Sequence, residues 1–259
     1  MIVDGYDTIL FDLDGVLYRG ADPIDGAAET VAALRAGGKR IAFVTNNSSR
    51  TPDAIARQLT SLGIDARPDE VETSALATAA LLRSRAAASA FVIGGDGLRI
   101  ALEDAGIRVL ERGSDRADAV VVGIDPTFVY ADLATASWLI HHGAALVASN
   151  ADATYPAADG VILPGAGAIV AAVEVATGAS AEVVGKPHGP IFREALRRSA
   201  GERPLVVGDR LDSDIEGARR LGWDSALVLT GISTEADVRT TGIEPTYVVA
   251  TLDGLLAHG

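Results

Sequence analysis

The chain has 259 residues, of which 48% are hydrophobic and none is cysteine, so it can bury a large core, while disulfides, thiol nucleophiles and thiolate metal sites are excluded. Its 35 acidic and 22 basic residues give a formal net charge of −13, which repels polyanions and argues against nucleic-acid partners. There is no apolar run of bilayer-spanning length and no signal-peptide pattern, so we expect a cytoplasmic protein without membrane attachment.

Short apolar segments alternate with helical patterns along almost the whole chain. The first strand is expected at residues 8–13 (TILFDL), followed by a helix over 26–36, a strand over 40–45 and a helix that starts at Pro52, after the N-capping Thr51. Further strands are expected at 90–95, 118–124, 145–150, 205–209 and 225–231, with helices over 98–105, 130–142, 166–177 and 213–221. This alternation predicts an α/β fold with a parallel sheet.

Two segments interrupt this pattern and mark the expected domain boundaries. They are the alanine-rich stretch 74–89 and the stretch TGASAEVVGKP at 177–187. If the chain leaves one sheet near the first and returns near the second, the middle forms an inserted α/β domain. We therefore predict a core domain from residues 1–79 and 182–259, with an inserted domain over 80–181.

Polar residues follow several of the expected strands. Asp12 and Asp14 end the first strand, Thr45 closes the segment RIAFVT, and Asp209 follows PLVVG. Because ligands bind at the carboxyl ends of parallel strands, these residues should face one crevice. The amides that begin at Asn46 also approach a helix N-terminus, where an anion is stabilised.

Each of these signals also has an ordinary structural explanation. An isolated Asp-x-Asp-Gly is typical of a turn, and an EF-hand does not fit, because Gly15 comes too early and no third ligand follows at the required spacing. A lone threonine is usually a cap and a lone lysine, such as Lys186 in VVGKPHG, is usually a surface residue. The occurrence of DLDG, VTNN, VGKPHG and VGDRLDSD in this order, each beside a strand, favours one shared site.

This set of motifs resembles that of the haloacid dehalogenase (HAD) superfamily of phosphatases. The resemblance implies a Rossmann-like, doubly wound parallel-sheet core with an inserted α/β cap domain. It implies that Asp12 is the nucleophile and Asp14 the general acid and base. The implied phosphate-binding residues are Thr45, Asn46 and Lys186, and the implied magnesium ligands are Asp12, Asp14, Asp209 and Asp214.

The length between VTNN and VGKP is similar to that of the p-nitrophenyl-phosphatase-like branch, subfamily IIA. The segment ASNADATYPAADGVILPGAGAIVAAVEVATG resembles the cap of phosphoglycolate and glycerol-phosphate phosphatases. By this resemblance, Asn150, Asp152 and Tyr155 are expected to contact the substrate, and the cap could also mediate a homodimer. Asp14 argues against a dehalogenase, because the dehalogenase relatives lack this second aspartate.

Electrostatics supports a metal cofactor at such a site. A carboxylate that attacks a phosphate dianion is repelled by roughly 4 kcal/mol per unit-charge pair at about 4 Å and an effective dielectric constant near 20. Lys186 alone cannot offset this repulsion, whereas Mg²⁺ suits an all-oxygen site that includes a substrate phosphate. We therefore expect a magnesium-dependent phosphatase that hydrolyses a small phosphorylated metabolite, such as phosphoglycolate or glycerol phosphate, through an aspartyl phosphate.

Other functions are compatible with parts of this pattern. Nucleotide or sugar phosphates are alternative substrates. A phospho-accepting signalling module also combines aspartates, a threonine and a lysine around magnesium, although its phosphorylated aspartate follows an earlier acidic pair, and here the pair opens the chain. A silent binding protein is a third interpretation, and magnesium-dependent hydrolysis would exclude it.

Overall fold

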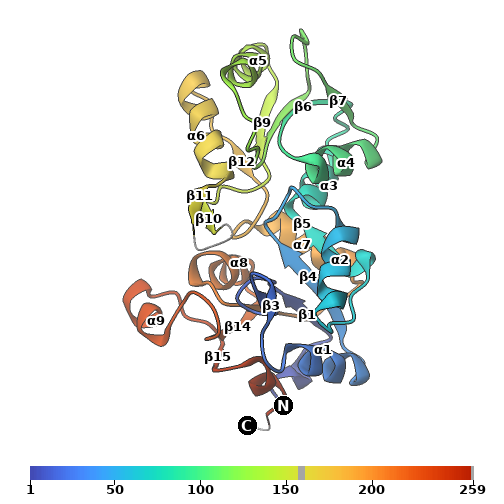
Figure 1. Ribbon diagram of the computed structural model, residues 1–259, viewed down its shortest axis with the longest axis vertical. Coiled ribbons are helices and arrows are strands. Elements are labelled where there is room, and N and C mark those ends of the chain that lie inside the picture. The colour runs from blue at the N-terminus through green and yellow to red at the C-terminus, as the bar shows by residue number, and fades with distance from the viewer. Residues whose placement is uncertain (157–160, 258–259) are drawn as a thin grey trace. The chain divides into compact units, whose positions relative to one another are not determined.

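The computed structural model describes residues 1–156 and 161–257 (Figure 1). The chain divides into two compact units: the first comprises Met1–Thr45, Pro52–Glu72 and Lys186–Gly259, and the second comprises Asn46–Thr51 and Thr73–Gly185. The predicted insertion over 80–181 falls inside the second unit, and its role as a cap stays a prediction. Residues 157–160 of the cap-like segment lie outside the described residues.

The first unit is built on a six-stranded sheet with the order β15-β14-β13-β1-β4-β5. β1 lies at its centre and pairs in parallel with β13 and β4, so that Phe11 lies beside Val207 and Phe43. All four residues of β1 are buried, which explains its unbroken apolar sequence, because strands covered on both faces do not alternate. The strands are β1 (Thr8–Phe11), β4 (Arg40–Thr45), β5 (Val71–Thr73), β13 (Pro204–Gly208), β14 (Asp224–Val228) and β15 (Tyr247–Val249).

Helices cover both faces of this sheet. Ile9 and Phe11 of β1 share a hydrophobic core with Val31 of α1 and Leu59 of α2. On the other face, α7 packs on β1 and β4, and α8 packs on β14. The helices of this unit are α1 (Ala27–Ala36), α2 (Pro52–Ser61), α7 (Gly189–Arg198), α8 (Glu216–Leu221) and α9 (Glu235–Thr241), and a short antiparallel ribbon is formed by β2 (Tyr18–Arg19) and β3 (Asp22–Pro23).

The second unit contains a five-stranded parallel sheet with the order β12-β9-β8-β6-β7. α5 and α6 pack against each other, and both contribute to the core that contains Val120 and Val122 of β8. α3 packs on α4. The elements are α3 (Ser74–Ser84), β6 (Ser89–Ile93), α4 (Asp96–Asp104), β7 (Arg108–Leu110), β8 (Ala119–Val122), α5 (Tyr130–His141), β9 (Ala145–Ala148), β10 (Thr154–Pro156), β11 (Ile162–Pro164), α6 (Ala166–Thr177) and β12 (Glu182–Val183).

Among the helices that the structure describes, none combines the length and the apolar character that a bilayer crossing requires.

Candidate active site

The carboxyl edge of the first unit's sheet brings together predicted residues from distant parts of the chain. Asp12 follows β1, and its backbone N–H donates to the Val207 carbonyl at 2.8 Å. Asp209 follows β13, the strand beside β1. Because neighbouring parallel strands end at the same edge, the two carboxylates come from adjacent positions, as the sequence pattern predicts.

Lys186 lies between two of the carboxylates. Its Nζ donates to Asp12 Oδ1 at 2.5 Å and to Asp214 Oδ1 at 2.7 Å. The lysine side chain is buried. Burial alone would lower the pKa of this ammonium, but the charges of Asp12 and Asp214 outweigh it and raise the pKa above its usual value. Lys186 therefore stays charged and fixes the two carboxylates.

Three carboxylates at this edge could hold a cation. Asp12, Asp209 and Asp214 each offer an oxygen atom, and these atoms all lie within 4.8 Å of one another. Asp209 Oδ2 accepts from the Ile232 N–H at 2.7 Å, whereas Asp209 Oδ1 is buried and has no hydrogen-bond partner in the described part of the chain. A buried oxygen without a partner inside an all-oxygen donor set fits a hard divalent cation such as Mg²⁺.

The same carboxylates are hard to keep ionised together. Burial, followed by the charges of Asp12 and Asp214, raises the pKa of Asp209 to about 7. Burial also raises the pKa of Asp214, to about 6, although Lys186 acts against this change. The metal-free site thus places three acidic groups against one lysine, a charge balance that a divalent cation would correct.

The backbone around Asp209 is shaped to leave it room. Gly15 has φ +84°, and a Cβ placed on it would lie 2.7 Å from Asp209 Cγ. Asp214 lies in a single π-helical turn, Leu211–Ile215, a form of helix that is frequent at functional sites. Its carboxylate accepts from the Arg210 N–H at 3.3 Å.

Two other predicted residues of this unit, Asp14 and Thr45, lie outside the group of three carboxylates. The Asp14 side chain is exposed, and among the described residues it is not part of the set of acidic groups that could share a metal. Thr45 ends β4, the other strand beside β1, and is partly buried. The proposed proton-transfer role of Asp14, its role as a metal ligand and the phosphate-binding role of Thr45 stay predictions.

The remaining predicted residues belong to the second unit. Asn46 Nδ2 donates to Asp152 Oδ2 at 3.1 Å, and the Asn150 side-chain amide donates to the Asn46 carbonyl at 2.8 Å. Tyr155 lies on β10 opposite Leu163. The structure therefore brings Asn46, Asn150 and Asp152 together, and their roles in binding, like that of Tyr155, stay predictions.

The segment after β14 also contributes to the site, and sequence reasoning missed it. Besides the Ile232 amide on Asp209, Thr230 Oγ1 donates to the Gly15 carbonyl at 2.7 Å. Each of these contacts has a backbone group as one partner, and backbone groups carry no sequence motif. Their one signal is position, because residues 230–232 follow a strand of the same sheet.

Comparisons with known proteins match nearly the whole chain. A family described as haloacid dehalogenase-like hydrolase matches residues 9–108, and a HAD-hydrolase-like family matches residues 183–255. An acid sugar phosphatase of Staphylococcus aureus is 39% identical, with 98% of each chain covered.

Solved structures of phosphatases have the same fold as this chain. A glycerol phosphate phosphatase of Mycobacterium tuberculosis, determined in complex with magnesium, is 40% identical with a TM-score of 0.92, over 98% of this chain and 77% of that one. A p-nitrophenyl phosphatase of Archaeoglobus fulgidus is 32% identical with a TM-score of 0.90, over 98% and 99% of the two chains. The predicted family, fold class and hydrolytic enzyme class are thereby confirmed: this chain belongs to the haloacid dehalogenase-like hydrolases.

Proposed function

We propose that this protein is a magnesium-dependent phosphatase of small phosphate monoesters, with Asp12 as its nucleophile. The observation that carries the proposal is the contact of buried Lys186 with Asp12 and Asp214 beside the partnerless oxygen of Asp209. Relatives that match nearly the whole chain are named as phosphatases. The class of reaction and the magnesium cofactor agree with these relatives, one of which was solved with that ion.

The chemistry follows from the residues of the first unit. An Asp12 carboxylate oxygen forms a bond to phosphorus while the ester P–O bond breaks, and Asp14 gives its proton to the departing alcohol. Asp14 then takes a proton from the water that attacks the aspartyl phosphate, which frees Asp12 and inorganic phosphate. The exposure of Asp14 suits this exchange of protons, and Lys186 keeps Asp12 positioned between turnovers.

A bound magnesium ion, held by Asp12, Asp209 and Asp214, would supply positive charge to the transferring phosphoryl oxygens. The protein contributes the fixed charge of Lys186 and, in the proposal, the hydroxyl of Thr45 and the amides that begin at Asn46.

The direct test uses p-nitrophenyl phosphate as substrate. The wild-type enzyme should release phosphate with magnesium and not with EDTA. Asp12→Asn should lower kcat by more than about 1000-fold, because it removes the nucleophile, and Asp53→Asn, at an exposed position on α2, should retain wild-type activity. Full turnover by Asp12→Asn would refute the assignment, and an acyl phosphate that persists for minutes would favour the signalling module.

We assign substrate selection to the second unit. Its sequence is inserted between the segments that carry Asp12 and Lys186, and its Asn46, Asn150 and Asp152 form a connected polar group. Glycerol phosphate, phosphoglycolate, sugar phosphates and nucleotides are the substrates to compare by kcat/KM. Asp152→Ala should change the ranking of these substrates more than it changes kcat for p-nitrophenyl phosphate; an unchanged ranking would remove Asp152 from the binding site.

A homodimer through the second unit is part of the proposal. Tyr130 and Trp138 of α5 are 82% and 53% exposed, and large exposed aromatic residues are enriched at interfaces. Sedimentation velocity should give twice the chain mass for the wild type and the monomer mass for Trp138→Asp. The expected cytoplasmic location and the lack of nucleic-acid partners stay predictions.

A further inference from the structure

The segment 230–233, which follows β14, holds Asp209 through its backbone. The Ile232 N–H donates to Asp209 Oδ2 at 2.7 Å, and the Ser233 N–H donates to the Asp209 carbonyl at 3.0 Å. A Cβ placed on Gly231 would overlap the Asp209 carboxylate, so only glycine lets the backbone come this close. These contacts fix Oδ2 of the carboxylate and leave the buried Oδ1 for a cation.

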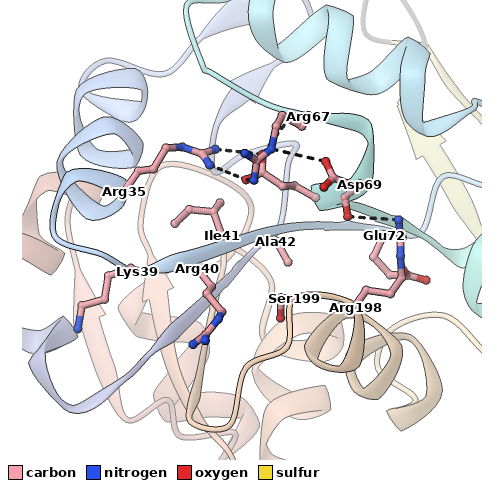
Figure 2. A pocket seen from close by; sticks show the side chains of 12 residues that line it. Arg35, Lys39, Arg40, Ile41, Ala42, Arg67, Asp69, Glu72, Arg198 and Ser199 are labelled. Atoms are coloured by element: carbon pink, nitrogen blue, oxygen red, sulfur yellow. Dashed lines mark hydrogen bonds and ion pairs between the residues drawn. The ribbon is translucent and has the colours of Figure 1, made fainter.

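Elsewhere in this unit, buried carboxylates are held by arginine. Glu70 accepts from Arg35 Nη2 at 3.0 Å, and Glu72 accepts from Arg198 Nη1 at 2.6 Å, both in the pocket at the start of β4 (Figure 2). An arginine in this role would compete with a cation for the negative charge of Asp209. The Ile232 N–H is neutral, so it orients the Asp209 carboxylate without competing for that charge.

Ser233 also connects this segment to the helical turn that carries a second metal ligand. Its side chain is buried, and its Oγ accepts from the Leu211 N–H at 3.0 Å. Leu211 is the first residue of the π-helical turn Leu211–Ile215, which contains Asp214. The first N–H groups of a helix have no partner within it, so Ser233 supplies this partner as a capping serine does, but from 22 positions away. One serine thus contacts the backbone of Asp209 and the start of the turn that holds Asp214.

We propose that Ser233 is a positioning residue of the magnesium site. Its N–H holds the carbonyl of Asp209 and its hydroxyl holds the turn of Asp214, so that together they fix the spacing of the two carboxylates. Ser233 acts through these ligands and is not a ligand itself. Magnesium requires nearly ideal octahedral geometry, and residues that orient metal ligands typically contribute about 10- to 100-fold to metal affinity. This inference rests on the magnesium site of the proposed function.

The test is isothermal titration calorimetry of the full-length, metal-free protein with MgCl₂ and, separately, with CaCl₂. Ser233→Ala removes the acceptor of the Leu211 N–H and should raise the Kd for magnesium at least about tenfold. The Kd for calcium should rise less than about threefold, because calcium accepts a flexible arrangement of oxygen ligands. A general loss of structure would weaken the binding of both ions alike, so the change in selectivity reports on positioning.

Two further variants serve as controls. Ser233→Thr keeps the hydroxyl and should bind magnesium more tightly than Ser233→Ala. Ser225→Ala removes a hydroxyl that is buried near the amino end of β14, away from the carboxylates, and should bind both ions as the wild type does.

The outcomes separate this inference from the proposed function. If the wild type binds magnesium and Ser233→Ala binds it equally well, or if Ser233→Ala loses affinity for both ions to the same extent, the positioning role is refuted while the metal site stands. A threonine variant that binds magnesium no better than the alanine variant would also refute the role of the hydroxyl. A wild type that binds no magnesium would refute the metal site itself, and this inference with it.

Discussion

Lys186 is the residue on which the geometry of the active site depends most. It is buried, and it is hydrogen-bonded to two carboxylates that come from opposite ends of the chain. Its motif, VVGKPHG, identified it in the sequence, because a positive charge was required among so many acidic groups. Its contact with Asp214 could not be predicted, because that contact depends on the π-helical turn Leu211–Ile215.

Lys186→Met should destabilise the metal-free protein as well as abolish activity. Removing one member of a buried charge cluster typically costs about 3–5 kcal/mol, since the other charges stay buried and unpaired. Urea unfolding in EDTA measures this loss. Adding Asp214→Asn to the variant should recover part of the stability, because one of the uncompensated charges is removed. Equal stabilities of the single and double variants would contradict this account of the cluster.

Gly15→Ala should disturb the site in two ways, by straining the backbone and by a steric clash of the new Cβ. Its φ of +84° disfavours any side chain, and the new Cβ would collide with the Asp209 carboxylate. Gly20→Ala is a matched control, because Gly20 has φ +61° but its Cβ would meet nothing within 4 Å. Both should lose about 1 kcal/mol of stability for the left-handed backbone. Gly15→Ala alone should also weaken magnesium binding, as measured by calorimetry, and equal affinities in the two variants would contradict the role of Gly15.

Among the elements, the long buried strands could be predicted from the sequence. The two-residue strands and α3, a helix buried on several sides, could not. β1, β4 and β13 are continuous apolar runs that end in polar residues. β2, β3 and β12 have two residues each, too few for any periodicity. α3 occupies the alanine-rich stretch that resembles a domain boundary in the sequence. Its buried residues point in several directions, so the sequence lacks the polar face that marks a surface helix.

β5 and α7 are joined by a hydrogen bond from Arg198 to Glu72 that no local pattern could indicate, because the two residues lie 126 positions apart. The raised pKa of Glu72, about 8 in place of 4.5, means that the folded protein holds a proton in this interval that the unfolded chain releases. Its contribution to stability is therefore fully present below pH 4.5 and is lost as the pH rises towards 8.

Glu72→Gln should isolate this effect, because glutamine mimics the neutral acid at every pH. The free energy of unfolding of the wild type relative to Glu72→Gln should fall between pH 5 and pH 8, by about 1.4 kcal/mol for each unit of pKa shift at most. Urea unfolding at several pH values provides the measurement, with Glu29→Gln, at an exposed position on α1, as the control. A difference that stays constant or rises with pH would show that Glu72 is ionised in the folded protein.

For the molecule as a whole, an excess of negative charge and a site with three carboxylates both favour the binding of a divalent cation. Magnesium at about 100 times its Kd would add about 2.7 kcal/mol to the stability of the folded state, which corresponds to a rise in Tm of roughly 5–10 °C for a chain of this size.

Thermal unfolding with magnesium and with EDTA tests this expectation. Asp209→Asn should remove most of the magnesium-dependent rise in Tm, because it withdraws the buried oxygen that lacks a partner. It should also raise the Tm in EDTA, since one buried acidic group is lost. A wild-type Tm that does not respond to magnesium would show that the carboxylates do not hold the ion.

The central position of β1 has a consequence for synthesis on the ribosome. β1 is translated long before β13, which pairs with it along one side, with Thr8 opposite Pro204. The nascent chain must therefore carry this apolar strand with one side unpaired until β13 has been translated. Asp12 can meet Asp209 only after β13 has been translated, and a truncated product that lacks β13 would expose an aggregation-prone edge.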